Sequence, residues 1–174
     1  MLRSIVFACV LLGGSGAAFA GPEDFKKGPV FENYGAVAFV PGVEFDASTQ
    51  FKVAFDVASA AEEGEINRRL ESAARFINMH VAAGMPLENI NLAVVVHGPA
   101  AMDLVTDDRY GSENANAGLI AALIDAGVSI QLCGQTAAYR DIAKSDLLPG
   151  VGLSLSAMTA HAELQQRGYS LNPF

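Results

Sequence analysis

Residues 91–100 read NLAVVVHGPA, and this stretch indicates the type of fold. Asn91–Val96 is a nearly continuous apolar run that ends in three β-branched valines, which is typical of a strand covered on both faces of a sheet. The run stops at His97, and Pro99 can occupy the first turn of a short helix that extends to about Val105. A doubly covered strand followed at once by a helix predicts a parallel α/β sheet.

The same alternation of strands and helices extends over most of the chain. Further strands are predicted at Gln50–Val57, Val128–Leu132, Val151–Leu155 and Gly168–Leu171, and helices at Glu62–Ala83, from Asn114 or Asn116 to Gly127, from about Gln135, and from Ser156 or Thr159 to Gln166. Glu62, Glu63 and Glu65 are expected at the solvated start of the first of these helices, and Thr106–Glu113 is expected to be a polar loop. The pattern predicts a single α/β domain with a mostly parallel sheet of about five strands, right-handed crossovers and helices on both faces.

The first twenty residues, MLRSIVFACVLLGGSGAAFA, have the layout of a secretory signal. One positive charge precedes an apolar run, and small residues then end in an A-x-A pattern. We expect cleavage after Ala20 and a periplasmic or secreted product. No later segment reaches the roughly 18 apolar residues of a membrane span, so no membrane insertion is expected after cleavage. Residues 21–49, rich in Gly, Pro and Phe, are predicted to form an N-terminal extension or arm before the domain of residues 50–174.

The composition excludes several classes of function. The formal net charge is −8, and lysines and arginines form no cluster. Nucleic acids and anionic membranes require concentrated positive charge, so neither is an expected partner. The chain has no GxSxG, phosphate-binding loop, dinucleotide-binding GxGxxG or HExxH, and no pair of histidines has metal-ligand spacing. These absences argue against a hydrolase of a common kind and against a nucleotide-binding enzyme. Neither a metal nor an organic cofactor is expected.

The candidate site centres on Cys133, at the end of the third core strand in VSIQLCGQTAAYRD, residues 128–141. Once Cys9 leaves with the signal, Cys133 is the only thiol and no internal disulfide can form. Such a thiol in an oxidising compartment is buried and inert, paired with another molecule, or reactive. A glycine and a helix start follow it, and amides at a helix start favour the thiolate. The inert alternative remains open, because cysteine is among the most buried residue types.

Other candidate residues surround this position in the sequence. The backbone amides of Gly134, Gln135 and Thr136 are expected to face the sulfur or an anion bound there. Arg140 lies one to two helical turns further on and either reaches an anion or lies in solvent.

His97 ends the second core strand, and sites of open α/β sheets collect at such carboxyl ends. It could act as a base or pair with the thiolate if its strand neighbours that of Cys133, or it could only cap its strand. His80 and His161 lie within predicted helices and are given no role.

Four stretches together resemble the DsrE/DsrF-like family. They are the strand ending VVVHGP, the helix of residues 116–127, the segment VSIQLCGQ, and LLPGVGLSLSAMTAHAELQQRGYSL. The resemblance covers roughly residues 50–174. It implies an α/β domain that assembles into homo-oligomers, commonly trimers or hexamers. It also implies a part in sulfur relay, in which one cysteine carries sulfur as a persulfide between partners. Cys133 matches the position of that cysteine, and His97 also resembles a family feature.

Two main hypotheses follow. The first is an exported sulfur-relay protein, sulfurtransferase-like at most, with sulfane sulfur on Cys133 and His97 assisting proton transfer. Established relay members of the family are cytoplasmic, so its partners would be other donor and acceptor proteins or small compounds such as thiosulfate or polysulfide. The second is a non-catalytic, oligomeric small-ligand-binding or scaffold protein in which Cys133 is buried and inert. An intermolecular disulfide through Cys133 is a third possibility.

Overall fold

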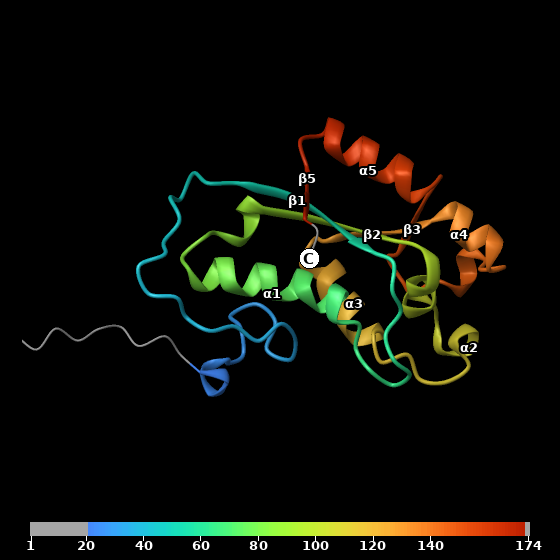
Figure 1. The fold of residues 1–174 in the computed structure, drawn as a ribbon, viewed down its shortest axis with the longest axis horizontal. Helices are drawn as coiled ribbons and strands as arrows, with labels where there is room; N and C mark the ends of the chain where they lie inside the picture. The colour runs from blue at the N-terminus through green and yellow to red at the C-terminus, as the bar shows by residue number, and fades with distance from the viewer. Residues whose placement is uncertain (1–20, 173–174) are drawn as a thin grey trace, which may run out of the picture.

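The computed structural model describes residues 21–172, so the predicted signal and its cleavage site lie outside the described residues. All five predicted strands are present close to their predicted bounds, and helices separate them (Figure 1). In chain order, with η for 3-10 helices, the elements are η1 Pro22–Asp24, β1 Phe51–Val57, α1 Arg68–Ala82, η2 Leu87–Asn89, β2 Ile90–Val96, η3 Gly98–Leu104, α2 Asp107–Tyr110, α3 Ala117–Asp125, β3 Ser129–Cys133, α4 Gly134–Tyr139, η4 Lys144–Asp146, β4 Gly152–Ser154, α5 Ala157–Gln166 and β5 Ser170–Asn172.

The strands form one parallel sheet in the order β4-β3-β2-β1-β5. This confirms the predicted α/β fold. The order reverses direction after β1, because the chain runs from β1 through β2 and β3 to β4 at one edge and returns to β5 at the other. Within the described residues, α5, between β4 and β5, is the helix that runs from one edge of the sheet to the other.

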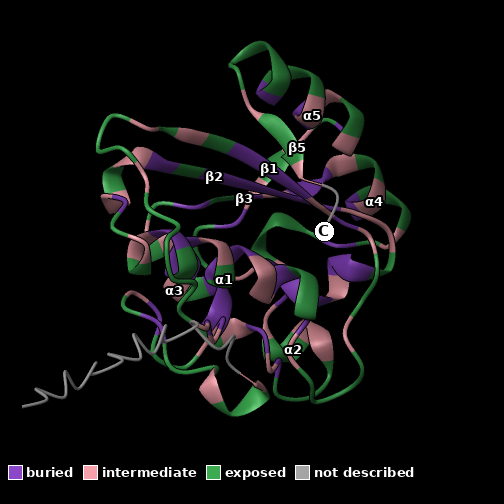
Figure 2. Cartoon of the chain, turned by 60° about the vertical axis from the view of Figure 1, so that its left-hand side comes forward, coloured by how far each residue is buried: buried purple, intermediate pink, exposed green. Residues whose placement is uncertain are grey.

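The two faces of the sheet are covered unequally. Alternate residues of the central strands pack under α1, α3 and η3 in the main core, and they are Val53, Phe55, Val57, Leu92, Val94, Val96, Ile130 and Leu132. The intervening Ala54, Ala93 and Val95 pack with Ala160 and Leu164 of α5 in a small second core, against which Ala157 and Tyr169 also pack. The central strands are mostly buried, whereas α5 exposes its outer side (Figure 2). Each fully buried Leu or Ile contributes about 1.5–3 kcal/mol, so the face of α1 and α3 carries most of the hydrophobic stabilisation.

Two local predictions were wrong. Glu62, Glu63 and Glu65 lie in the loop before α1 and not in its first turn. The helix begins only after Asn67, whose side-chain oxygen accepts a hydrogen bond from the Arg69 amide at 2.9 Å. An N-cap of this kind ends the extended chain and starts the helix, and it overrides the glutamates' tendency to extend the helix backwards. The predicted polar loop at residues 106–113 contains the four-residue helix α2, which Gly111 ends with a left-handed φ of 92°.

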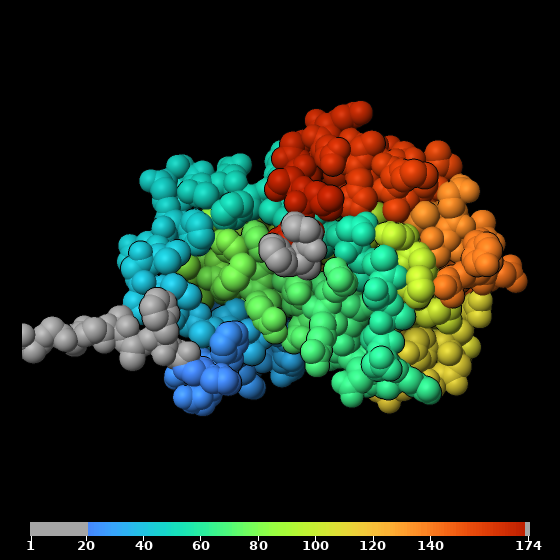
Figure 3. Space-filling view, viewed as in Figure 1, coloured from blue at the N-terminus to red at the C-terminus, as the bar shows by residue number. Residues whose placement is uncertain are grey.

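The N-terminal segment, residues 21–49, lies against α1 of its own chain. The fully buried Asn78 of α1 holds it. Its side-chain oxygen accepts from the amides of Val30 and Phe31, and its nitrogen donates to the carbonyls of Phe31, Tyr34 and Gly35. In the space-filling view this segment and α4 lie at opposite ends of the molecule (Figure 3). The segment is therefore remote from the carboxyl end of β3.

None of the helices within residues 21–172 is long and apolar enough to cross a lipid bilayer.

Candidate functional site

Cys133 is the last residue of β3 and directly precedes the first turn of α4. Its side chain is 6% exposed and lines a cavity of about 310 Å³. Burial raises the pKa of the thiol, but hydrogen bonds to the sulfur from the Thr136 hydroxyl and from the amides of Thr136, Ala157 and Gln135 outweigh it. The pKa of Cys133 therefore lies below its ordinary value. These donors come from α4 and from the start of α5, so two helix starts converge on one sulfur.

The Thr136 hydroxyl is held in the orientation that serves the sulfur. Its oxygen accepts a hydrogen bond from the Gly98 amide at 3.1 Å, which leaves its one proton for Cys133. Gly98 follows β2 and has a left-handed φ of 58°, so a glycine is favoured there. The turn after β2 thus helps to orient a donor that belongs to the turn after β3.

Gly134 is required by the close approach of β4. A Cβ atom at this position would lie 2.5 Å from the Ser154 carbonyl oxygen and 3.1 Å from that of Leu155. Both contacts are with backbone atoms, which cannot rotate away. The glycine after Cys133 therefore allows the chain to turn into α4 beside β4, and this places the Gln135 and Thr136 amides at the sulfur.

His97 and Cys133 stand at the ends of neighbouring strands, as a role of His97 beside the thiol requires. β2 and β3 are neighbours, and Val96 pairs with Leu132. His97 directly follows β2 and Cys133 is the last residue of β3, so the two residues close neighbouring strands, which in a sheet lie about 4.8 Å apart. Both side chains line the same cavity. Their roles in catalysis remain predictions.

Asp56 joins His97 to a second histidine. The Oδ2 atom of Asp56 lies 3.2 Å from Nε2 of His97, and its Oδ1 atom lies 2.8 Å from Nε2 of His161. Asp56 belongs to β1 and His161 to α5, so three elements meet at this carboxylate. Burial raises the pKa of Asp56, but the hydrogen bonds and charges of His161 and His97 outweigh it and hold the pKa below its ordinary value.

The cavity collects residues from β1, β2, β3, α4 and α5. Its lining consists of Asp56, His97, Cys133, Gln135, Thr136, Ser156, Ala157, Met158 and His161. Of the residues predicted for the site, the structure brings Cys133, His97, Gln135 and Thr136 together there. Gly134 and Arg140 are not part of the lining, and the Arg140 carbonyl accepts a hydrogen bond from Nη2 of Arg109 at 2.9 Å.

Sequence reasoning missed Asp56 and His161. Asp56 could have been found, because a carboxylate near the carboxyl end of a mostly apolar strand lies at the edge where sites collect. His161 gave no such signal, because its place above β1 depends on how α5 crosses the sheet. A histidine inside an amphipathic helix does not reveal which strand it faces.

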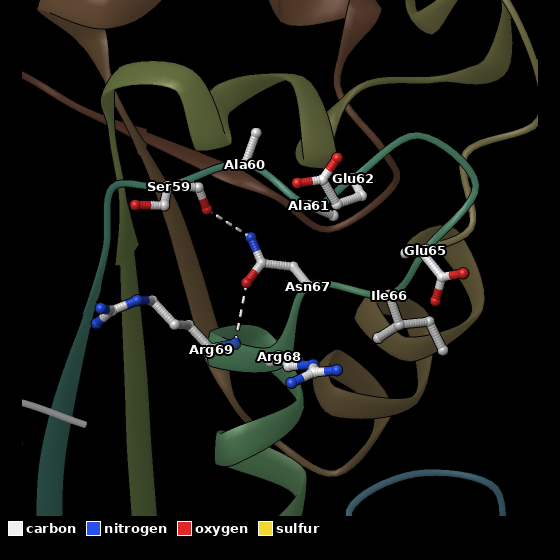
Figure 4. A pocket seen from close by; sticks show the side chains of 9 residues that line it. All are labelled: Ser59, Ala60, Ala61, Glu62, Glu65, Ile66, Asn67, Arg68 and Arg69. Atoms are coloured by element: carbon white, nitrogen blue, oxygen red, sulfur yellow. Dashed lines mark hydrogen bonds between the residues drawn. The ribbon is translucent and has the colours of Figure 1, made fainter.

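A larger hollow of about 480 Å³ lies at the start of α1 and is lined by residues 59–62 and 65–69. It holds no cysteine and no histidine. Figure 4 shows that Asn67 points across it, with its side chain already bonded to the Ser59 carbonyl and the Arg69 amide. The polar side chain in this hollow therefore serves to cap α1 and to hold the preceding loop.

Within residues 21–172, no group of three or more His, Cys, Asp or Glu side chains is placed to hold a metal ion.

Comparison with known proteins gives consistent matches over the domain that carries the site. The sequence model described as the DsrE/DsrF-like family matches residues 52–173. Among curated proteins, none matches the chain significantly. A solved protein of unknown function from Methanobacterium thermoautotrophicum is 22% identical with a TM-score of 0.57, over 72% of this chain and 100% of its own. The ychN protein from E. coli is 17% identical with a TM-score of 0.54, over 71% of this chain and 100% of its own. At these identities the two structures establish the fold.

Proposed function

We propose a function that starts from one established fact, namely that this chain belongs to the DsrE/DsrF-like family. The proposed function is that of an exported sulfur-relay protein that carries sulfane sulfur as a persulfide on Cys133. Membership of the family indicates sulfur relay in general. The assignment to Cys133 is carried by one observation, namely that four hydrogen-bond donors from α4 and α5 converge on its sulfur.

The hydrogen bonds to Cys133 suit both the free and the loaded state of the residue. A thiolate is the nucleophile in attack on sulfur, and the donors raise its fraction at neutral pH. In the transfer step, the thiolate attacks the sulfane sulfur of the donor, and the donor's own S–S bond breaks. The bonding electron pair leaves with the remainder of the donor, as sulfite from thiosulfate or as a shorter chain from polysulfide. The terminal sulfur of the persulfide is anionic, so polar donors that line the cavity would stabilise it.

Export and assembly are parts of the proposal that rest on the sequence. The signal-like residues 1–20 support a periplasmic or secreted location, where thiosulfate or polysulfide would be natural donors. The family resemblance supports a homo-oligomer, trimer or hexamer. Donor and acceptor proteins would then meet the open cavity at the carboxyl end of the sheet.

The test is the intact mass of the purified protein after exposure to polysulfide or to thiosulfate, with peptide mapping of the modified cysteine. We expect a gain of one sulfur atom on Cys133 that dithiothreitol reverses and that Cys133→Ser abolishes. Arg140→Ala is the matched control, because Arg140 is near in sequence but does not line the cavity. Absence of sulfur on Cys133 with both donors would contradict sulfur relay at this residue.

The second candidate function is a ligand-binding or scaffold protein with an inert thiol, and the low exposure of Cys133 favours it. Labelling with a small neutral alkylating agent separates the two. Rapid labelling of the folded protein supports the first function. Labelling only after denaturation supports the second, and a covalent dimer on a non-reducing gel would instead indicate an intermolecular disulfide.

A further inference from the structure

The Asp56 carboxylate is shared by two histidines from different elements. Each of its oxygens faces the Nε2 atom of a different ring, His97 from the end of β2 and His161 from α5. The side chains of His97 and His161 are only 33% and 18% exposed, so both contacts are partly shielded from water. One anion therefore fixes the orientation of two imidazole rings inside the cavity of Cys133.

This arrangement determines which nitrogen of each ring carries the proton. A carboxylate only accepts hydrogen bonds, and the low pKa of Asp56 keeps it ionised at neutral pH. Both neutral rings must then be Nε2–H tautomers, which leaves Nδ1 of each ring as the basic atom. Val96 of β2 pairs with Leu132 of β3, so His97 and Cys133 come next at the ends of two neighbouring strands, and both side chains line the same cavity.

We propose that Asp56 is the positioning residue of this site, and that it holds His97 in the tautomer and orientation that accept the proton of Cys133. In this step the proton moves from the sulfur to Nδ1 of His97, and a thiolate and an imidazolium result. His161 fixes the other oxygen of Asp56 and so keeps the carboxylate from turning away. The inference deepens the proposed function, since it rests on Cys133 as the reacting group.

The direction in which the pKa of Cys133 changes on removal of Asp56 separates a positioning role of Asp56 from an effect of its charge alone. Asp56, His97, Cys133 and His161 are the titratable groups that line the cavity. By its charge alone, the Asp56 anion disfavours a nearby thiolate, so its removal would lower the pKa of Cys133. By positioning His97 and stabilising its imidazolium, Asp56 favours the thiolate, so its removal would raise that pKa. The two effects have opposite directions.

The experiment is the rate of alkylation of Cys133 by iodoacetamide in the purified protein as a function of pH, followed by peptide mass. A neutral reagent is used so that the charge of the cavity does not alter its entry. For Asp56→Asn we expect the thiol pKa to rise by about one unit, and therefore a rate near pH 7 that is about tenfold lower. His97→Gln should give a similar loss, and the double variant should add little, because the two residues act as a unit.

The matched control is Asp141→Asn, which removes an exposed carboxylate outside the cavity at a left-handed φ of 52° that asparagine tolerates. It should leave the pH profile unchanged. An unchanged or lowered thiol pKa in Asp56→Asn would overturn the proposal. So would a folded wild-type protein whose Cys133 is not alkylated at any pH.

A second measurement needs no variant. Long-range ¹H–¹⁵N NMR of the wild-type protein should show His97 and His161 as Nε2–H tautomers when neutral, and an Nδ1–H tautomer at His97 would refute the assignment. Neither measurement requires a sulfur donor. Normal alkylation without any sulfur loading would therefore contradict the proposed relay while leaving the role of Asp56 intact.

Discussion

Gly134 faces the carbonyl oxygen of Ser154 so closely that a methyl group on its α carbon would lie 2.5 Å from that oxygen. Gly134→Ala must therefore push the start of α4 away from β4. We expect a loss of about 1–3 kcal/mol in the free energy of unfolding, because neither backbone segment can yield without strain. The loss is measured by urea denaturation. The same change displaces the Gln135 and Thr136 amides, so alkylation of Cys133 should slow as well; an unaffected alkylation rate would contradict the account of this turn.

Thr136 contributes the hydroxyl proton that points at Cys133. Thr136→Val keeps the shape of the side chain but removes this donor and leaves the Gly98 amide without its acceptor. We expect the pKa of Cys133 to rise, because a hydrogen bond to the thiolate is lost while burial is unchanged. Thiolate absorbance as a function of pH gives the shift. Thr136→Ser keeps the hydroxyl and should titrate like the wild type; equal shifts in both variants would refute a role for the hydroxyl.

Asn78 should be the main attachment of the N-terminal segment to the domain. Asn78→Ala removes the acceptor for two amides and the donor for three carbonyls of residues 30–35. We expect the free energy of unfolding to fall by about 3 kcal/mol or more, because several buried backbone groups lose their hydrogen-bond partner together.

Limited proteolysis checks where that stability is lost. Cleavage in the Asn78→Ala variant should begin within residues 21–49. Asn89→Ala is the control, because Asn89 makes a single, exposed bond to the Ala47 carbonyl. Equal protection of the segment in wild type and Asn78→Ala would show that other contacts hold it.

Asp103 should make stability fall as the pH rises above the acid range. Burial of this carboxyl outweighs its bonds to Asn67 and Ala61, so its pKa lies above the ordinary value of 3.8. Between 3.8 and that raised pKa, the folded protein keeps a proton that the unfolded chain has lost. The contribution to the unfolding free energy is therefore greatest below 3.8 and decreases as the pH rises through this window.

Asp103→Asn removes the titrating group and isolates its effect. Urea unfolding of both proteins from about pH 3 to 8 gives the difference in their unfolding free energies at each pH. We expect the wild type to lose stability relative to the variant as the pH rises, and the difference to level off once Asp103 is ionised in both states. A gain in the stability of the wild type relative to the variant as the pH rises would mean that the ionised carboxylate is the stabilised form.

The sheet could be predicted from the sequence because its strands are signalled locally. The apolar run of β2 and the glycines after the helices are features of a few residues each, and they hold whatever the tertiary contacts. The start of α1 was placed wrongly because Glu62–Glu65 and Asn67 offer competing helix starts. Packing of Asn67 against Asp103 and Asn116 decided between them.

From the sequence, only those site residues that lie at the end of a predicted strand could be identified. Cys133 and His97 close neighbouring strands, so the parallel register brings them together. Asp56 and His161 are 105 positions apart and meet only because α5 crosses the face of the sheet between β4 and β5. Arg140 lies at the end of α4 and outside the cavity lining. Its spacing from Cys133 in the sequence did not indicate the direction of the side chain.

The path of α5 from one edge of the sheet to the other has a consequence for the order of assembly. The helix is tethered by β4 and β5, each of three residues, and it supplies both the Ala157 amide and His161. The main core of α1, α3 and the central strands can form from residues that are synthesised earlier. The surroundings of the thiol are therefore completed last. Until α5 has packed on the sheet, the sulfur of Cys133 lacks its hydrogen bond from the Ala157 amide and the cavity lacks His161, so the thiol gains its full set of neighbours only at that stage.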